Sequence, residues 1–200
     1  MKDILVLIAQ AHGSNTPGKR SPDGKFREYV FSRKVSNMIV EKLHKYDIDS
    51  IIINPEDEEV KLSIQAARIN KLIEQYNSKY KDIILISPHV NAGPNNDWSN
   101  ASGWTVFVYD KASKKSRKLA RIMSEIAYNK YNLKGNRYIP ESGYFEANFA
   151  ILRQTNCPAI LSENMFMTNR ENVDFLVSKQ GLEIISDLHV FSILEYMKTI

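Results

Sequence analysis

Short apolar runs and amphipathic stretches alternate along the chain. Consecutive apolar residues are typical of strands buried on both faces, whereas apolar residues spaced three or four positions apart mark one face of a helix. The runs predict strands at residues 4–9, 50–54, 82–87, 103–110 and 158–162. The spaced pattern predicts helices at 29–46, 57–80, 113–131 and 180–198.

This alternation predicts an α/β domain with a largely parallel central sheet and helices on both faces. The 200 residues contain no internal repeat and no clear linker, so we expect one domain over residues 1–200. In such sheets, ligands bind beyond the carboxyl ends of the strands.

Composition narrows the class of protein. The chain is 43% hydrophobic and 25% charged, which is ordinary for a soluble globular protein. Its single cysteine, Cys157, excludes an intrachain disulfide and a CxxC zinc site. The net charge of +4 is compatible with loose contact with anionic polymers but identifies no partner. The lysines are scattered and no aromatic-basic motif occurs, so we expect no nucleic-acid binding.

The first apolar run is a strand in this interpretation. Residues 4–9 are too few for a secretion signal, and Asp3 directly precedes them. No segment approaches the about 18 apolar residues of a membrane span. We therefore expect no membrane span, no signal peptide and synthesis in the cytoplasm.

Three of the predicted strands lead to an ionisable side chain. "DILVLIAQAHGS" ends at His12, "ILISPHVNAG" contains His89, and "CPAILSENMF" contains Glu163. The carboxyl ends of parallel strands meet at one edge, so these groups are expected to converge. Two histidines and a glutamate form one of the established ligand sets of catalytic zinc. With zinc-bound water and a glutamate that moves its proton, such a site suits amide hydrolysis.

The carboxylates cannot be assigned to roles by spacing alone. Glu28 begins the first long helix, where the helix dipole favours an anion, and Glu163 leaves a strand beside the histidines. Either could complete the ligand set or act as the base. Hydrogen-bonded structural histidines without metal are the simpler alternative. The carboxylates considered are Asp23, Glu28, Glu141, Glu146 and Glu163.

At these positions the sequence resembles a family. "AHGSNTPG", Glu28 in "FREYVFSRKVSNMIVEKL", "SPHVNAG", "ASGWTVFVYD" and "ILRQTNCPAILSENMFMTNRENVDFL" are similar, in order, to motifs of the Amidase_3-type N-acetylmuramoyl-L-alanine amidases. The similarity runs from about Leu5 to Tyr196.

The resemblance implies a role for each residue. It implies that His12, Glu28 and His89 hold one Zn²⁺ and that Glu163 is the catalytic general base and acid. The implied reaction cuts the peptidoglycan amide between the lactyl group of N-acetylmuramic acid and the L-alanine of the stem peptide. The resemblance also implies a twisted, mostly parallel sheet of about six strands.

A further set of expectations concerns where the protein works. The substrate partner is peptidoglycan, and the site of action is the bacterial cell wall. We expect a monomer without a separate wall-binding domain. The compact length and missing signal favour a phage-type lysin or a prophage autolysin.

Four positions depart from the family pattern. Ser14 stands in place of a second glycine, Gln65 in place of an arginine, and Met165 in place of a glycine. Pro88 replaces an isoleucine and is expected to end strand pairing, because proline lacks the N–H donor. None of these departures removes a ligand, but they leave the shape of the substrate groove open.

Two other functions are weighed against the amidase. A zinc peptidase acting on stem peptides would release different muropeptides. A wall-binding protein with a degenerate metal site would cleave nothing and hold no stoichiometric zinc.

Overall fold

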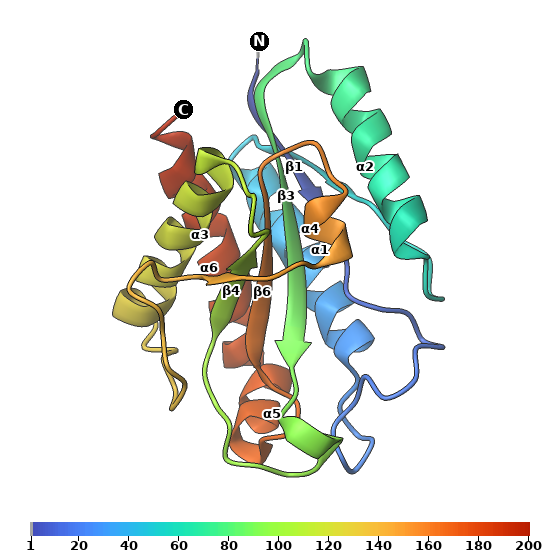
Figure 1. Cartoon of the computed structure of the whole chain (residues 1–200), viewed down its shortest axis with the longest axis vertical. Coiled ribbons are helices and arrows are strands. Elements are labelled where there is room, and N and C mark those ends of the chain that lie inside the picture. Colours follow the sequence, from blue (N-terminus) through green and yellow to red (C-terminus); the bar gives the residue numbers. More distant parts are fainter. Residues whose placement is uncertain (1) are drawn as a thin grey trace.

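A computed structural model describes residues 2–200, with Asn96 described by its backbone alone. A six-stranded sheet of order β2-β1-β3-β6-β4-β5 forms its centre (Figure 1). The strands are β1 (Lys2–Ile8), β2 (Asp49–Ile52), β3 (Tyr80–Asn91), β4 (Thr105–Val108), β5 (Phe145–Glu146) and β6 (Ala159–Phe166). The helices are α1 (Glu28–Lys45), α2 (Leu62–Tyr76), α3 (Lys114–Glu125), α4 (Ala150–Arg153), α5 (Arg170–Val177) and α6 (Lys179–Met197). A 3-10 turn covers Pro94–Asn96, and a π-helical turn, Ile126–Lys130, extends α3.

The fold class predicted from the sequence is confirmed. Strands β2, β1, β3 and β6 are parallel, and among the strand pairs of the sheet described over residues 2–200 only that of β4 with β6 is antiparallel. Two central strands are longer than predicted, since β3 reaches Asn91 and β6 reaches Phe166. The second long helix begins later than predicted, at Leu62.

Helices cover both faces of the sheet, as the apolar runs require. Helices α1, α3 and α6 pack on the face that carries Val6, Ile84 and Ile160. Helices α2 and α4 lie on the opposite face, which carries Leu85 and Leu161 (Figure 1). Side chains alternate between faces along a strand, so a strand buried on both sides is apolar throughout.

Within residues 2–200, no helix has both the length and the apolar character needed to cross a bilayer.

The expectation that Pro88 ends strand pairing is wrong. Pro88 is in register with Ser162, and His89 with Glu163. Successive residues of β3 form hydrogen bonds in turn to its two neighbouring strands. Leu85 N donates to Pro158 O on the side of β6, whereas Ile86 O accepts from Ala9 N on the side of β1.

The position of Pro88 in this alternation explains why pairing continues. Its nitrogen belongs to the set that faces β1, so the ladder with β6 loses no donor. The carbonyl that lacks this partner, Ala9 O, accepts the Ser87 hydroxyl at 2.8 Å instead. Ser32 of α1 donates to Pro88 O, also at 2.8 Å.

A bulge follows in β6. The register shifts between His89 and Asn91, and Met165 adopts a left-handed backbone with φ of 64°. The turn that is often a glycine in the resembled family is therefore made here by methionine. Up to this bulge, His89 and Glu163 stand side by side on the two central strands.

Helix α1 is fastened to α6 through a half-buried lysine. Lys42 donates to Glu183 and Asp187, each at 2.6 Å, and to Ser186 at 2.8 Å. Because Glu28 is the first residue of α1, this contact also fixes the helix that carries the Glu28 carboxylate.

Candidate metal centre

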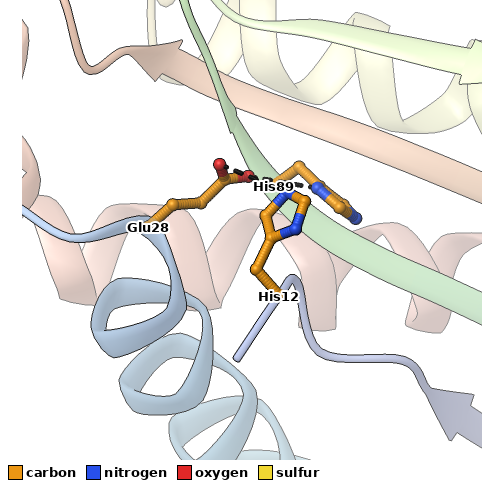
Figure 2. A group of neighbouring side chains, drawn as sticks. All are labelled: His12, Glu28 and His89. Atoms are coloured by element: carbon orange, nitrogen blue, oxygen red, sulfur yellow. Dashed lines mark hydrogen bonds and ion pairs between the residues drawn. The ribbon is translucent and has the colours of Figure 1, made fainter. Parts of the chain in front are cut away.

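Three side chains predicted from the sequence converge at the carboxyl ends of the strands. His12 lies in the loop after β1, Glu28 begins α1, and His89 belongs to β3. Figure 2 shows the three side chains turned toward one another. Nε2 of His12 lies 3.5 Å from Oε2 of Glu28, and Nδ1 of His89 lies 3.1 Å from Oε1. One ligand atom from each residue falls within 4.8 Å of the other two.

The backbone around His12 is held in an unusual conformation. Its φ is 55°, in the left-handed region that few non-glycine residues adopt. Arg33 donates to His12 O at 2.9 Å, and Ser32 accepts from Ala11 N at 2.8 Å. Both partners belong to α1, so the helix that begins with Glu28 also fixes the turn that presents His12.

The Glu28 carboxyl is buried and ionised. Burial alone would raise its pKa, but the hydrogen bond with His89, the charges of His89 and His12 and the Val90 N–H outweigh burial and lower the pKa. Burial likewise opposes the positive charge of His89, yet Glu28 holds the His89 pKa above its ordinary value. At His12 burial is the largest effect and lowers the pKa, which favours the neutral imidazole that binds metals.

These residues fit a zinc ion. Oε1 of Glu28 accepts from Val90 N at 3.0 Å, but Oε2 is buried and has no hydrogen-bond partner among residues 2–200. A buried carboxylate oxygen without a partner is costly, and a cation placed between it and the two imidazoles would satisfy it. Three nitrogen and oxygen ligands that leave a further position open are typical of catalytic zinc.

Glu163 lies beside this cluster. It is the register partner of His89, is half-buried, and its Oε2 has no hydrogen-bond partner within the described chain. Burial is the main cause that raises its pKa, to about 7; the charge of Glu28 adds to the rise, and that of His89 opposes it. A carboxyl with this pKa can both accept and release a proton near neutrality.

A buried polar network joins the two strands behind His89 and Glu163. Asn164 donates to His89 O at 2.8 Å and to the Ser162 hydroxyl at 3.2 Å. Trp104 donates to Asn164 at 2.9 Å, and Ser162 lies 2.8 Å from His189 of α6. Because every member of the network has a partner, it holds the backbone of β3 against that of β6.

A cavity of about 240 Å³ opens onto the cluster. His12, His89 and Glu163 form part of its wall. Gln65 also lines it, and its amide donates to Val60 O at 2.7 Å. The remaining lining residues are Gln10, Lys19, Glu59, Leu62, Ser87, Phe149, Ala150, Ile151 and Leu161.

The other carboxylates considered from the sequence are not part of the cluster. Asp23 accepts from the Ser21 hydroxyl at 2.6 Å, Glu146 pairs with Arg117, and Glu141 is exposed. Sequence reasoning missed Glu59, whose Oε2 lies 3.7 Å from Nδ1 of His12.

Comparison with known proteins agrees with the geometry. The family profile described as N-acetylmuramoyl-L-alanine amidase, Amidase_3, matches residues 6–195. An endolysin of Bacillus phage SPP1 is 24% identical over 197 residues, which cover 96% of this chain and 66% of the endolysin. A probable cell wall amidase, LytH, of Staphylococcus saprophyticus is 24% identical over 98% of this chain and 59% of its own length. The chain thus spans less than two thirds of the length of either relative.

Solved structures share the fold. An N-acetylmuramoyl-L-alanine amidase from Clostridium difficile 630 superposes with a TM-score of 0.83 and 24% identity, over 100% of this chain and 99% of the other. The Ami1 amidase of Mycobacterium smegmatis gives a TM-score of 0.83 at 16% identity, with the same coverage of both chains. At these identities the likeness concerns the fold.

Proposed function

The chain belongs to the N-acetylmuramoyl-L-alanine amidase family of the Amidase_3 type, and from this premise we propose that it is a zinc-dependent peptidoglycan amidase. The bond cut is the amide between the lactyl group of N-acetylmuramic acid and the L-alanine of the stem peptide. The observation that carries the proposal is the position of Glu163, in register with His89 and beside a partly buried His-Glu-His cluster.

In this proposal His12, Glu28 and His89 hold the metal. A zinc ion bound there would supply a Lewis acid for the scissile carbonyl and lower the pKa of a water to roughly 7. Glu28 contributes the negative charge of the ligand set, and its low pKa keeps it ionised. His12 is kept neutral by burial, so it can bind without first losing a proton.

Glu163 carries the proton. Its carboxylate takes a proton from the attacking water and gives it to the leaving amine of L-alanine, so the amide nitrogen departs as an amine. The unpartnered Oε2 is free to do so, and burial, which raises the pKa of Glu163, favours the protonated form that the second step needs. No nucleophilic side chain is needed for this hydrolysis.

We place the activity in a single catalytic domain over residues 1–200 and at the bacterial cell wall. The endolysin and the probable cell wall amidase among the relatives support an action on the wall, as a lysin or an autolysin. We propose a monomer, because one chain contributes every residue of the cluster.

Mass spectrometry of the soluble products from purified peptidoglycan tests the proposal. Free stem peptides with an N-terminal L-alanine, lost on chelation and restored by zinc, are the expected result. Cuts within the peptide would make the protein a zinc peptidase, and binding to walls of several chemotypes without any product would make it a wall-binding protein.

Two variants assign the roles of the residues. Glu163→Ala should keep the fold and the zinc but lose most activity, because the ligand set is intact and the proton carrier is gone. His89→Ala should lose both zinc and activity. Full activity in Glu163→Ala would exclude Glu163 as the base.

A further inference from the structure

The guanidinium of Arg137 rests on aromatic rings. It lies 4.8 Å from the centroid of the Phe145 ring and 6.0 Å from those of Phe107 and Phe166. Aromatic faces attract cations, and a stacked guanidinium loses little freedom when it then binds a ligand. Arg137 comes from the irregular segment before β5, so these contacts define where its charge stands.

This cation stands next to the candidate active site. Phe107 of β4 is the register partner of Leu161, two residues before Glu163 on the same face of the sheet. Phe149 lines the 240 Å³ cavity and packs edge-on against Phe107, with ring centroids 5.3 Å apart. Two aromatic rings, Phe107 and Phe149, thus connect the guanidinium to the wall of the cavity. Its positive charge also contributes to the electrostatic environment of Glu163.

Arg137 has no anionic partner of its own. Within residues 2–200 its side chain forms neither a hydrogen bond nor an ion pair, whereas Arg117, which also stands over an aromatic ring, is paired with Glu146. Stacking occupies only the face of a guanidinium and leaves its N–H groups free at the edge. That edge is suited to a carboxylate, which it binds through two parallel hydrogen bonds.

The substrate of the proposed function offers such a group. The carboxyl of L-alanine forms the peptide bond to the second stem residue, a glutamate linked onward through its γ-carboxyl. The first free carboxylate after the scissile amide is therefore the α-carboxylate of this glutamate. Two residues span at most roughly 7 Å, which keeps this carboxylate near the site of cleavage. In some cell walls the same group is amidated and carries no charge.

We propose that Arg137 binds the α-carboxylate of the second stem residue and makes the enzyme selective for non-amidated stem peptides. This inference rests on the proposed function.

A matched pair of soluble substrates tests this selectivity. They are N-acetylmuramoyl-L-alanyl-γ-D-glutamyl-L-lysine and the same molecule with the glutamate α-carboxyl amidated. The zinc-loaded wild type should cleave the acid with a kcat/KM about tenfold above that for the amide, the ratio expected for a charge-assisted hydrogen bond. Arg137→Gln should lose this preference through a higher KM for the acid, so that its kcat/KM for the acid falls to that for the amide.

Arg170→Gln is the matched control. Arg170 also stacks on an aromatic ring, 4.0 Å from the centroid of Trp98, but it lines a different cavity. This variant should keep the wild-type preference. An equal loss on both substrates in Arg137→Gln, or a wild type that cleaves both substrates with the same kcat/KM, would overturn the proposal.

A binding measurement separates this proposal from the amidase proposal. Calorimetry with zinc-loaded Glu163→Gln and Glu163→Gln/Arg137→Gln gives the affinity for both molecules without turnover. Tighter binding of the acid only when Arg137 is present supports the inference, even if the wild type cleaves neither molecule and the amidase proposal fails. If Glu163→Gln and Glu163→Gln/Arg137→Gln bound the acid with equal affinity, Arg137 would have no role in binding, whatever the activity of the wild type.

Discussion

Nδ1 of His12 lies 3.7 Å from Oε2 of Glu59, while Nε2 of the same ring faces Glu28 at 3.5 Å. Thr16 donates to the same Glu59 oxygen, and Glu59 N donates to Asn15 at 2.8 Å. Glu59 is therefore fixed to the loop that carries His12. A carboxylate behind a metal-binding histidine orients the ring and raises its basicity.

Glu59→Gln should weaken zinc binding about tenfold, because the amide keeps the shape but not the charge behind His12. Competition with a chromogenic chelator measures this affinity. The control is Glu58→Gln, since Glu58 is exposed and adjacent. If both variants bound zinc as the wild type does, Glu59 would have no part in orienting His12.

Gly13→Ala should push the loop that carries His12 away from the loop that carries Glu59. A β-carbon at Gly13 would lie 1.9 Å from Glu59 N and 2.3 Å from the Glu58 carbonyl carbon, and these backbone atoms cannot move alone. We expect a loss of about 1–3 kcal/mol in the free energy of unfolding, together with weaker zinc binding. Urea denaturation of Gly13→Ala and of the neighbouring control Ser14→Ala measures the first effect, and equal midpoints would contradict it.

Zinc should stabilise the wild type and leave Glu28→Gln nearly unchanged. At a free concentration of 100 times Kd a ligand adds about 2.7 kcal/mol, or about 5–10 °C in Tm for a chain of this length. Calorimetric melting with and without zinc shows the shift. His44→Ala, at an exposed position on α1, controls for zinc bound by surface histidines. An equal shift in Glu28→Gln would remove Glu28 from the ligand set.

His189 should make the metal-free protein sensitive to acid. Its ring is fully buried, 2.8 Å from the Ser162 hydroxyl and 2.7 Å from Ile185 O. Burial lowers its pKa from 6.5 to about 4, so on acidification the unfolded chain takes up this proton first. The contribution is fully present above about pH 6.5 and is lost as the pH falls toward 4, by about 3 kcal/mol.

Urea unfolding at pH 7, 6, 5 and 4.5 follows this loss. His189→Gln should be less stable at pH 7 but should lose less free energy of unfolding between pH 7 and 4.5 than the wild type. The other buried acids and bases titrate alike in both proteins, so the difference reports on His189. Parallel pH profiles would mean that His189 keeps an ordinary pKa in the fold.

The position of three site residues could be predicted from local pattern. His12, His89 and Glu163 each follow an apolar run, and parallel strands bring such ends together. Glu28 could not be separated from the other carboxylates by spacing, and only the resemblance to a family singled it out. The structure brings Glu28 to the two histidines because α1 folds back over the turn at His12.

Other features depend on contacts that one strand or loop does not encode. Glu59 is one of several acidic residues in "NPEDEEVK", and only the contact between two loops selects it. Continued pairing at Pro88 depends on its nitrogen facing β1 rather than β6, which the proline rule does not include. Strand β5 and helix α4 span too few residues for a periodic pattern of apolar positions to reveal them in the sequence.

The contact of Lys42 with α6 links the candidate metal centre to the order of synthesis. All three candidate ligands have left the ribosome once residue 89 is free, yet Glu183 and Asp187, which anchor the helix bearing Glu28, are made almost a hundred residues later. A nascent chain thus has its ligands long before it has the scaffold that fixes them. If the chain binds zinc as proposed, tight metal loading is expected only after α6 has docked.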